Sequence, residues 1–327
     1  MKYIEQWQVL DCPCLVDKVT ERIARLGAKH LSYAGRLTLI KSVLSTLHNY
    51  WARIFILPKT VLNSIDAICR AFLWHGQEQK ESSVLVSWNQ ICKPRRKGGL
   101  GLKLLHQWNV ALMVGQWRRL CAVKTQLKTW LYDEAWRDSG SDYTVKLGYS
   151  WLVDACPDVL WYPWIQNRIM LPKHNFFIWL VAHKRLLTQD RLIRLHITQS
   201  NRCYLCAADE EDLNHLFFSC SFSRQCVRPL EDWLSICLLT RVIDWWIAIR
   251  ERSLVKKQVV AAAVAHLMYL IWHARNRCRL ESVIPLPVML IKQVKELLQW
   301  RVRYSRVKIG SRRSQDWVNS LCQSVTN

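Results

Sequence analysis

Acidic residues are scarce in this sequence of 327 residues, which contains 25 Asp and Glu against 47 Lys and Arg, for a formal net charge of +22. A chain with such an imbalance repels itself unless an anionic partner lies close by. Nucleic acid is therefore the first partner to consider, and an acidic membrane surface is the second.

Long apolar runs are also lacking. The most apolar window, "VVAAAVAHLMYLIW" at residues 259–272, is 14 residues long and contains His266. Because a membrane-spanning helix needs about 20 apolar residues, we interpret this window as a core helix and expect no membrane segment. The N-terminal "MKYIEQWQVL" lacks the apolar core of a signal peptide, and disulfide frameworks are typical of much shorter chains. The 13 cysteines therefore favour a reduced, intracellular protein of the nucleus or cytoplasm.

Most apolar residues in the sequence recur at helical spacing, so we predict a mainly α fold. In the first zone, residues 1–140, the stretches "LSYAGRLTLIKSVLSTLHNYW" and "LPKTVLNSIDAICRAFLWHG" place apolar residues three and four positions apart. Ser32 is the expected N-cap of the first helix, and Gly76 ends the second. Val84 and Val86 alternate like a short strand, and Gly98-Gly99 predicts a turn.

The remaining sequence divides into two further zones. Residues 141–235 contain a cysteine cluster, preceded by a helix that begins near Pro172 and a shorter helix capped by Thr188, with Asp190 in its first turn. Residues 236–327 hold two expected helices and end in "RVRYSRVKIGSRRSQDW". Its first thirteen residues carry basic side chains and no acid, and we expect this tail to be disordered when free.

The cysteine cluster has the spacing C-x2-C-x8-H-x4-C, formed by Cys203, Cys206, His215 and Cys220. A C-x2-C pair can direct two thiolates at one ion, and three sulfurs with one nitrogen form a favoured tetrahedral zinc set. On a continuous α-helix, His215 and Cys220 would lie about 140° apart. We therefore expect His215 on a short helix and Cys220 on the turn after it. With four protein ligands the Zn²⁺ would be structural; the alternative is a group of ordinary buried cysteines.

An acidic run, Asp209 to Asp212, lies inside this cluster. A two-metal nuclease site is one interpretation. Four consecutive carboxylates cannot converge on one point, however, whereas acids that open a helix are common. We therefore favour the second interpretation.

The motifs and their order resemble the C-terminal part of a plant LINE-type (non-LTR) retrotransposon reverse transcriptase. "LSYAGRLTLIKSVL", "AICRAFLWHG" and "ICKPRRKGGLGLK" are similar to the region that follows the polymerase palm. "LWYPWIQNRIMLPKHNFFIWLVAHKRLLTQDRL" and "CYLCAADEEDLNHLFFSC" are similar to the zinc-binding domain, and together the matches cover roughly residues 12–235. The resemblance implies a thumb-like helical region over 1–140, a small helical CCHC zinc-binding domain over 141–235, and a helical segment with a basic tail over 236–327.

The sequence departs from an active polymerase in its catalytic residues. A palm needs paired aspartates to hold magnesium, and no Asp-Asp pair occurs in these 327 residues. We therefore expect no enzyme activity but a nucleic-acid-binding remnant that contacts RNA template or target DNA, with other retroelement domains as further partners. The alternatives are a fragment of an active RNA-directed DNA polymerase polyprotein and an inert relict.

Two groups of basic residues are the candidates for phosphate contact. Lys93, Arg95, Arg96 and Lys97 lie in an expected turn, and Lys184, Arg185, Arg191 and Arg194 follow the "FFIWL" helix. Such charges supply affinity that is independent of base sequence and weakens with salt. Tyr204, Phe217 and Phe218 are candidates for stacking unpaired bases. The alternatives are a solvated basic face and aromatic side chains that fill the core around the metal.

Overall fold

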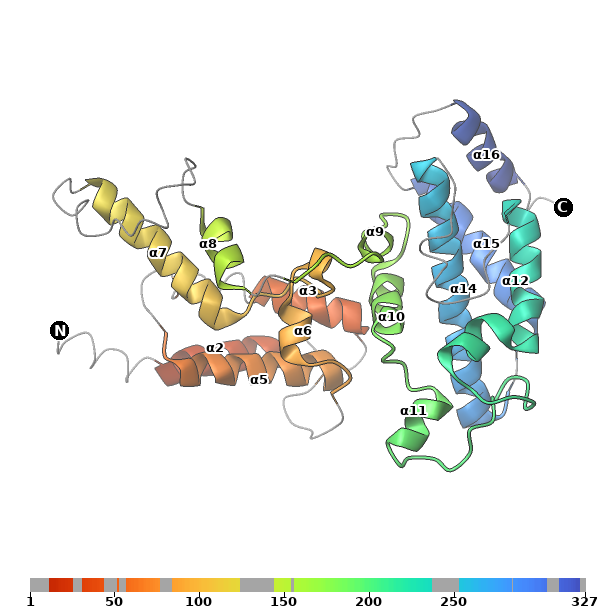
Figure 1. Ribbon diagram of the computed structural model, residues 1–327, viewed down its shortest axis with the longest axis horizontal. Coiled ribbons are helices and arrows are strands. Elements are labelled where there is room, and N and C mark those ends of the chain that lie inside the picture. The colour runs from red at the N-terminus through yellow and green to blue at the C-terminus, as the bar shows by residue number, and fades with distance from the viewer. Residues whose placement is uncertain are drawn as a thin grey trace. The chain divides into compact units, whose positions relative to one another are not determined.

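The protein is described by a computed structural model, which covers residues 12–25, 31–43, 52, 57–76, 84–123, 144–153, 156–236, 253–283, 285–304 and 312–323 (Figure 1). Helices form the architecture of these ranges, which contain no strand and one isolated antiparallel bridge, between Arg202 and Glu210. The prediction of a mainly α fold is therefore confirmed. The chain divides into two compact units, unit 1 at Met1–Val159 and unit 2 at Leu160–Asn327.

Unit 1 is built around α5 (Lys59–His75), which packs against α2 (Cys12–Ala24), α3 (Tyr33–Val43) and α7 (Leu105–Val123). The buried face of α5 carries apolar side chains at helical spacing, namely Val61, Leu62, Ile65, Cys69, Phe72 and Leu73. Three shorter elements complete the unit: α6 (Trp88–Cys92), the 3-10 turn Arg95–Lys97, and α8 (Val145–Leu152), which packs on α7.

The helix signals of unit 1 are confirmed where the structure describes them. The Ser32 hydroxyl accepts a hydrogen bond from the Gly35 amide at 3.3 Å, and Gly76 ends α5 with a φ of 71°, in the left-handed region that favours glycine. The strand expected at Val84 and Val86 is wrong. These residues lie in an irregular segment that leads into α6, and no described residue pairs with them as a neighbouring strand.

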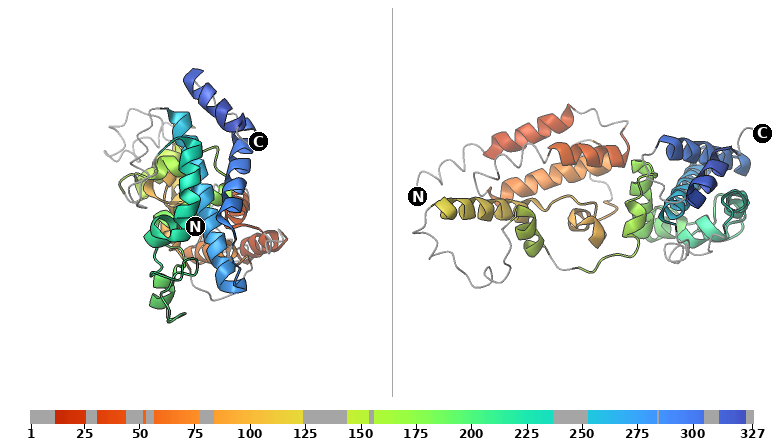
Figure 2. Two further views of the ribbon diagram at one scale, coloured as in Figure 1. Left: turned by 90° about the vertical axis from the view of Figure 1, so that its right-hand side faces the viewer. Right: turned by 90° about the horizontal axis from the view of Figure 1, so that it is seen from above.

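Unit 2 consists of a helical layer and the segment that carries the cysteine cluster. Helices α12 (Ser221–Leu234), α14 (Leu254–Glu281) and α15 (Pro287–Tyr304) pack side by side, as Figures 1 and 2 show. Helix α10 (Pro172–Ala182) packs on α14 and on the short α9 (Tyr162–Ile165). The remaining elements are α11 (Gln189–Arg194), a π-helical turn (His215–Ser219) and α16 (Arg312–Gln323).

Helix α14 lies at the centre of this unit. Among the described residues it is the one helix whose length and composition would allow it to cross a membrane, with 28 residues. However, 67% of its most apolar window is buried inside the protein, as is common for the core helix of a compact unit. The expectation that the window at 259–272 forms a core helix agrees with this packing, and the absence of a membrane partner stays a prediction.

The C-terminal region differs from the disordered tail expected. Arg301 and Arg303 belong to the last turn of α15, and Arg312 and Arg313 begin α16. The tail prediction is therefore wrong for these residues. Buried Val318 and Leu321 give α16 an apolar face, a feature that the basic composition concealed. Residues 305–311 lie outside the described ranges, and the division at 140 and 235 stays a prediction.

Candidate metal centre

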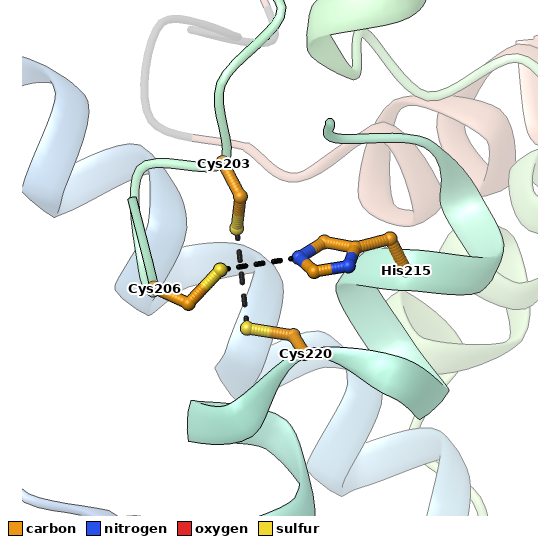
Figure 3. Close-up of side chains that lie close together, drawn as sticks. All are labelled: Cys203, Cys206, His215 and Cys220. Carbon is orange, nitrogen blue, oxygen red and sulfur yellow. Dashed lines mark hydrogen bonds between the residues drawn. The ribbon is translucent and has the colours of Figure 1, made fainter. Parts of the chain in front are cut away.

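The four side chains of the cysteine cluster converge on one point, as Figure 3 shows. Their ligand atoms all lie within 4.8 Å of one another. The Sγ atoms of Cys203 and Cys220 are 3.9 Å apart, and Sγ of Cys206 lies 3.3 Å from Nε2 of His215. With Zn–S near 2.3 Å and Zn–N near 2.0 Å, a tetrahedral zinc ion separates its ligands by about 3.8 Å for two sulfurs and about 3.5 Å for sulfur and nitrogen. The four residues therefore fit a tetrahedral cation.

A tight turn positions the first two cysteines. The amide of Ala207 donates to the carbonyl of Cys203 at 2.8 Å, and Ala207 takes a φ of 57°. The amide of Cys203 in turn donates to the carbonyl of Asp209 at 2.9 Å, beside the bridge between Arg202 and Glu210. This loop returns on itself, so that both thiols face the same side.

A π-helical turn positions the other two ligands. The amide of Cys220 donates to the carbonyl of His215 at 2.7 Å, five residues back rather than four. The wider turn returns Cys220 towards the side of His215, whereas an α-helix would separate them by about 140°. The side chain of Asp212 caps the turn, because its Oδ1 accepts from the His215 amide at 2.6 Å. The helix expected at His215 is thus present, in a less common form.

The second ring nitrogen of His215 has partners of its own. Nδ1 lies 3.5 Å from the Ser219 hydroxyl and 3.8 Å from Oδ2 of Asp209. A hydrogen-bonding group at the far nitrogen of a metal-binding histidine fixes the ring orientation and leaves the other nitrogen as the ligand. In this site that ligand is Nε2, which faces Cys206.

The paired thiols of Cys203 and Cys220 titrate differently. The hydrogen bond from Cys203 is the largest effect that lowers the pKa of Cys220 to about 5, and the backbone amides of Ser223 and Phe222 in the first turn of α12 add to it, against the effect of burial. The same hydrogen bond, followed by burial, raises the pKa of Cys203. One thiolate is therefore favoured beside one thiol, and a bound cation would favour both as thiolates.

Glu211, in the middle of the acidic run, is completely buried, which sequence analysis missed. Its carboxylate accepts from Nε of Arg275 on α14, at 2.9 Å to Oε1 and 3.1 Å to Oε2, and a further guanidinium nitrogen lies 2.7 Å from Oε1. The side chains are 0% and 1% exposed. Glu211 is therefore not one of several solvated acids, and the expectation that the whole run merely opens a helix is wrong at this residue.

Glu211 also holds α11. Its Oε1 accepts from the Gln189 amide at 3.0 Å, and its carbonyl accepts from the Asp190 amide at 3.1 Å. Thr188 occupies the N-cap position as expected, but its hydroxyl donates to Asp190 rather than accepting from a backbone amide. The carboxylate of Glu211 takes over part of the capping role, and this ties α11 to the metal-binding segment.

The structure brings three of the predicted phosphate-binding residues together at α11. Burial lowers the pKa of Arg191, and the charges of Arg185 and Arg194 lower it further, while Asp190 alone raises it. Nη1 of Arg191 is buried without a hydrogen-bond partner. Lys184 is exposed just after α10, with a φ of 53°. We call Arg185, Arg191 and Arg194 the α11 arginine cluster.

The other basic group forms a folded turn in unit 1. Arg95 and Arg96 are exposed on the 3-10 turn, next to half-buried Lys93, and Lys97 pairs with Asp158 at 3.1 Å. The turn needs Gly99, because a Cβ there would lie 1.9 Å from the Lys93 carbonyl oxygen. Burial and the nearby charge of Arg95 lower the pKa of Lys41 to about 8. Cations thus gather around this turn.

The aromatic candidates for base stacking are mostly unsuited to that role. Phe217 is 1% exposed and packs edge-on against Phe177, with ring centroids 6.3 Å apart. Phe218 is half-buried. Tyr204 is also half-buried, beneath the guanidinium of Arg275 at 5.5 Å. Phe217 therefore fills the core beside the metal-binding segment, as the alternative interpretation held.

Comparison with known proteins agrees with this geometry. Residues 143–226 match the family described as zinc-binding in reverse transcriptase, and these residues include all four clustered ligands. Residues 143–226 are thus similar to the zinc-binding domain of reverse transcriptases, which confirms this part of the resemblance noted from the sequence.

One protein similar to this chain is a putative ribonuclease H protein of Arabidopsis thaliana, which is 36% identical to it over 115 residues. The matched region is 35% of this chain, and the chain spans only 18% of the length of that relative. No solved structure matches the chain.

Proposed function

We propose that this chain is a non-catalytic nucleic-acid-binding region in which a structural zinc ion holds a cationic surface in place. Its ligands would be RNA template or target DNA, in the nucleus or cytoplasm, alongside other domains of a retroelement. The family match and the cysteine–histidine cluster support the zinc-binding part of this proposal.

The donor set favours zinc and a structural role. Three thiolates and one imidazole form a favoured zinc shell, and softer ligands of this kind exclude magnesium and calcium as the preferred ions. A catalytic zinc site keeps one coordination position for water, whereas here Cys203, Cys206, His215 and Cys220 supply four ligands. The ion would stabilise the fold of the segment that contains it.

The connection through Glu211 is the observation that carries the proposal. Glu211 lies between the second and third metal ligands, and it hydrogen-bonds to the first residues of α11 and to Arg275. Metal binding would therefore fix the α11 arginine cluster, in which Arg191 lies near two further guanidinium groups and near Asp190, which pairs with Arg194 at 2.5 Å. Clustered arginines are suited to phosphate, which they bind through paired N–H donors.

The experiment that tests this proposal is a titration of the full chain with labelled RNA and DNA at several salt concentrations. Arg185→Gln, Arg191→Gln and Arg194→Gln together should weaken binding and reduce the dependence of log K on log salt by about 2 for a single strand. A matched control removes the same charge from exposed positions in α2 and just after it, as Lys18→Gln, Arg22→Gln and Arg25→Gln. Zinc content serves as the test of folding for the arginine variant, and hydrogen exchange at α2 and α5 serves as that test for the control.

Equal losses in the two triple variants would mean that net charge alone governs binding, which contradicts an arginine cluster held by the metal segment. Absence of binding at low salt would contradict the nucleic-acid part of the proposal altogether. A weaker contribution is expected from Arg95 and Arg96 in unit 1, measured in the same titration with Arg95→Gln and Arg96→Gln.

A second candidate is that the chain is part of an active RNA-directed DNA polymerase polyprotein. The observation that favours it is that the chain spans only 18% of the length of the relative it matches. Sequencing the full transcript tests this directly, because an upstream palm with paired aspartates would support an enzyme. A third alternative, an inert relict, predicts neither bound zinc nor cooperative unfolding.

A further inference from the structure

We propose that Trp300 and Tyr304, at the C-terminal end of α15, form a platform on which unpaired bases of single-stranded nucleic acid stack. This inference rests on the proposed function and adds a site that lies outside the metal centre and both predicted basic groups. Helix α15 places the two rings side by side, because residues four apart lie on one face of a helix.

The two rings are exposed although they belong to a well-packed helix. Trp300 is 52% exposed and Tyr304 is 71% exposed, whereas Val294 and Leu298, also on α15, are 0% and 4% exposed. The ring centroids of the pair are 5.3 Å apart, with 43° between the ring planes. The pair thus presents to solvent about half of the surface of Trp300 and most of that of Tyr304.

The backbone beneath this platform is held firmly. Nε of Arg301 donates to the carbonyl of Ile169 at 2.7 Å, and Nη2 donates to the carbonyl of Arg168 at 2.8 Å. Arg303 donates to the carbonyl of Cys322 on α16 at 2.9 Å. The end of α15 is therefore fixed to α16 and to the chain before α10, so stacking would require little ordering of the protein.

Two arginines lie beside the pair in the last turn of α15. The guanidinium of Arg301 lies 5.9 Å from the ring centroid of Trp300, and Arg303 lies on the same helical turn. Arg301 also lies close enough to buried His174 to lower its pKa, after the larger effects of burial, His266 and Lys173. The acid on the preceding turn, Glu296, is close to Lys292 at 4.0 Å. This surface therefore favours an anionic ligand.

Single-stranded nucleic acid fits both features. Its bases have open faces that stack on tryptophan and tyrosine, and its phosphates are attracted by arginine and lysine. In a duplex the bases already stack on one another, so the aromatic pair would gain little contact. The platform should accept any base, because every base offers a flat aromatic face.

The test compares oligothymidylate with an abasic oligonucleotide of equal length, bound to the full chain. Replacing both rings, as Trp300→Ala with Tyr304→Ala, should weaken binding to oligothymidylate by roughly 10- to 100-fold and leave the abasic probe almost unaffected. The salt dependence should not change, because no charge is removed. The conservative variant Trp300→Phe with Tyr304→Phe should recover most of the affinity.

A control variant removes exposed apolar side chains elsewhere, as Leu286→Ala with Val288→Ala, which are 69% and 76% exposed. It should bind both probes like the parent chain. Equal weakening of both probes, or unchanged binding by the ring-deleted variant, would overturn the platform while the proposed function stands. Failure of the parent chain to bind any nucleic acid would overturn the proposed function and the platform with it. Exclusive binding of another protein at the two rings would also overturn the platform.

Discussion

Replacing Glu211 by glutamine should destabilise unit 2 by roughly 3–5 kcal/mol, because it leaves the charge of Arg275 buried without its counter-ion. Glutamine has nearly the same shape and its carbonyl can still accept from the Gln189 amide, so packing and capping change little. What the replacement removes is the negative charge of Glu211. The Arg275 side chain is 1% exposed, and its Nη1 donates to Oδ1 of Asn276 at 3.0 Å.

A comparison within the same helix sets the scale. Arg277 and Glu281 also lie on α14 and also form an ion pair, at 3.2 Å, but their side chains are 54% and 56% exposed. Glu281→Gln should therefore cost roughly 0.5 kcal/mol or less, since exposed pairs are weak. Both variants replace the glutamate of an ion pair by glutamine, but one pair is buried and the other is exposed. The difference between their losses in free energy of unfolding therefore measures the effect of burial.

Urea unfolding of the full chain, followed by hydrogen exchange at the amides of α14 and α11, is the measurement. The Glu211→Gln variant should also bind zinc more weakly, because the residue lies between Cys206 and His215 in the chain. A double variant, Glu211→Met with Arg275→Met, should recover much of the lost stability, since neither charge is then buried alone. If Glu211→Gln costs no more than Glu281→Gln, the reasoning from the buried pair is refuted.

Three further predictions concern the metal ligand, the glycine turn and buried histidine. Cys206→Ala should abolish stoichiometric zinc binding and speed hydrogen exchange over residues 200–235, while α2 and α5 keep their protection; faster exchange in unit 1 as well would contradict a local role. Gly99→Ala should destabilise unit 1 by about 1–3 kcal/mol in chemical denaturation, because its Cβ would lie 1.9 Å from a carbonyl oxygen, whereas Gly35→Ala, with 3.6 Å to its nearest neighbour, should not. Burial, followed by nearby cations, lowers the pKa of His174 to about 3, against 6.5 ordinarily. The unfolded chain therefore binds the extra proton, and the contribution of His174 to stability, present above pH 6.5, is lost as the pH falls towards 3. His174→Phe should reduce the drop in melting temperature between pH 7 and pH 5, and an unchanged drop would rule out this residue as its source.

The metal centre could be predicted from the sequence because its ligands are close in the chain and chemically distinctive. Cys203, Cys206, His215 and Cys220 have a spacing that few other structures require, and Pro172 and Gly76 act locally on the backbone. The π-helical form of the turn could not be predicted. The π-helical turn depends on His215 and Cys220 meeting at one point in space, and helical periodicity in the sequence does not indicate that meeting.

The role of Glu211 could not be predicted for a different reason. Its partner Arg275 lies 64 residues away in the sequence, and an acid within a run of acids gives no local sign of burial. The strand expected at Val84 and Val86 failed because alternation alone does not supply a neighbouring strand. The basic composition of residues 301–313 likewise drew attention away from the apolar side chains of α15 and α16, which are buried.

Metal analysis of the purified full chain, combined with X-ray absorption at the zinc edge, tests the central claim most directly. The account predicts one zinc ion per chain with three sulfur neighbours near 2.3 Å and one nitrogen near 2.0 Å. It also predicts loss of cooperative unfolding in unit 2 when a chelator removes the ion. Cooperative unfolding of unit 2 without metal, or zinc with water among its neighbours, would contradict it.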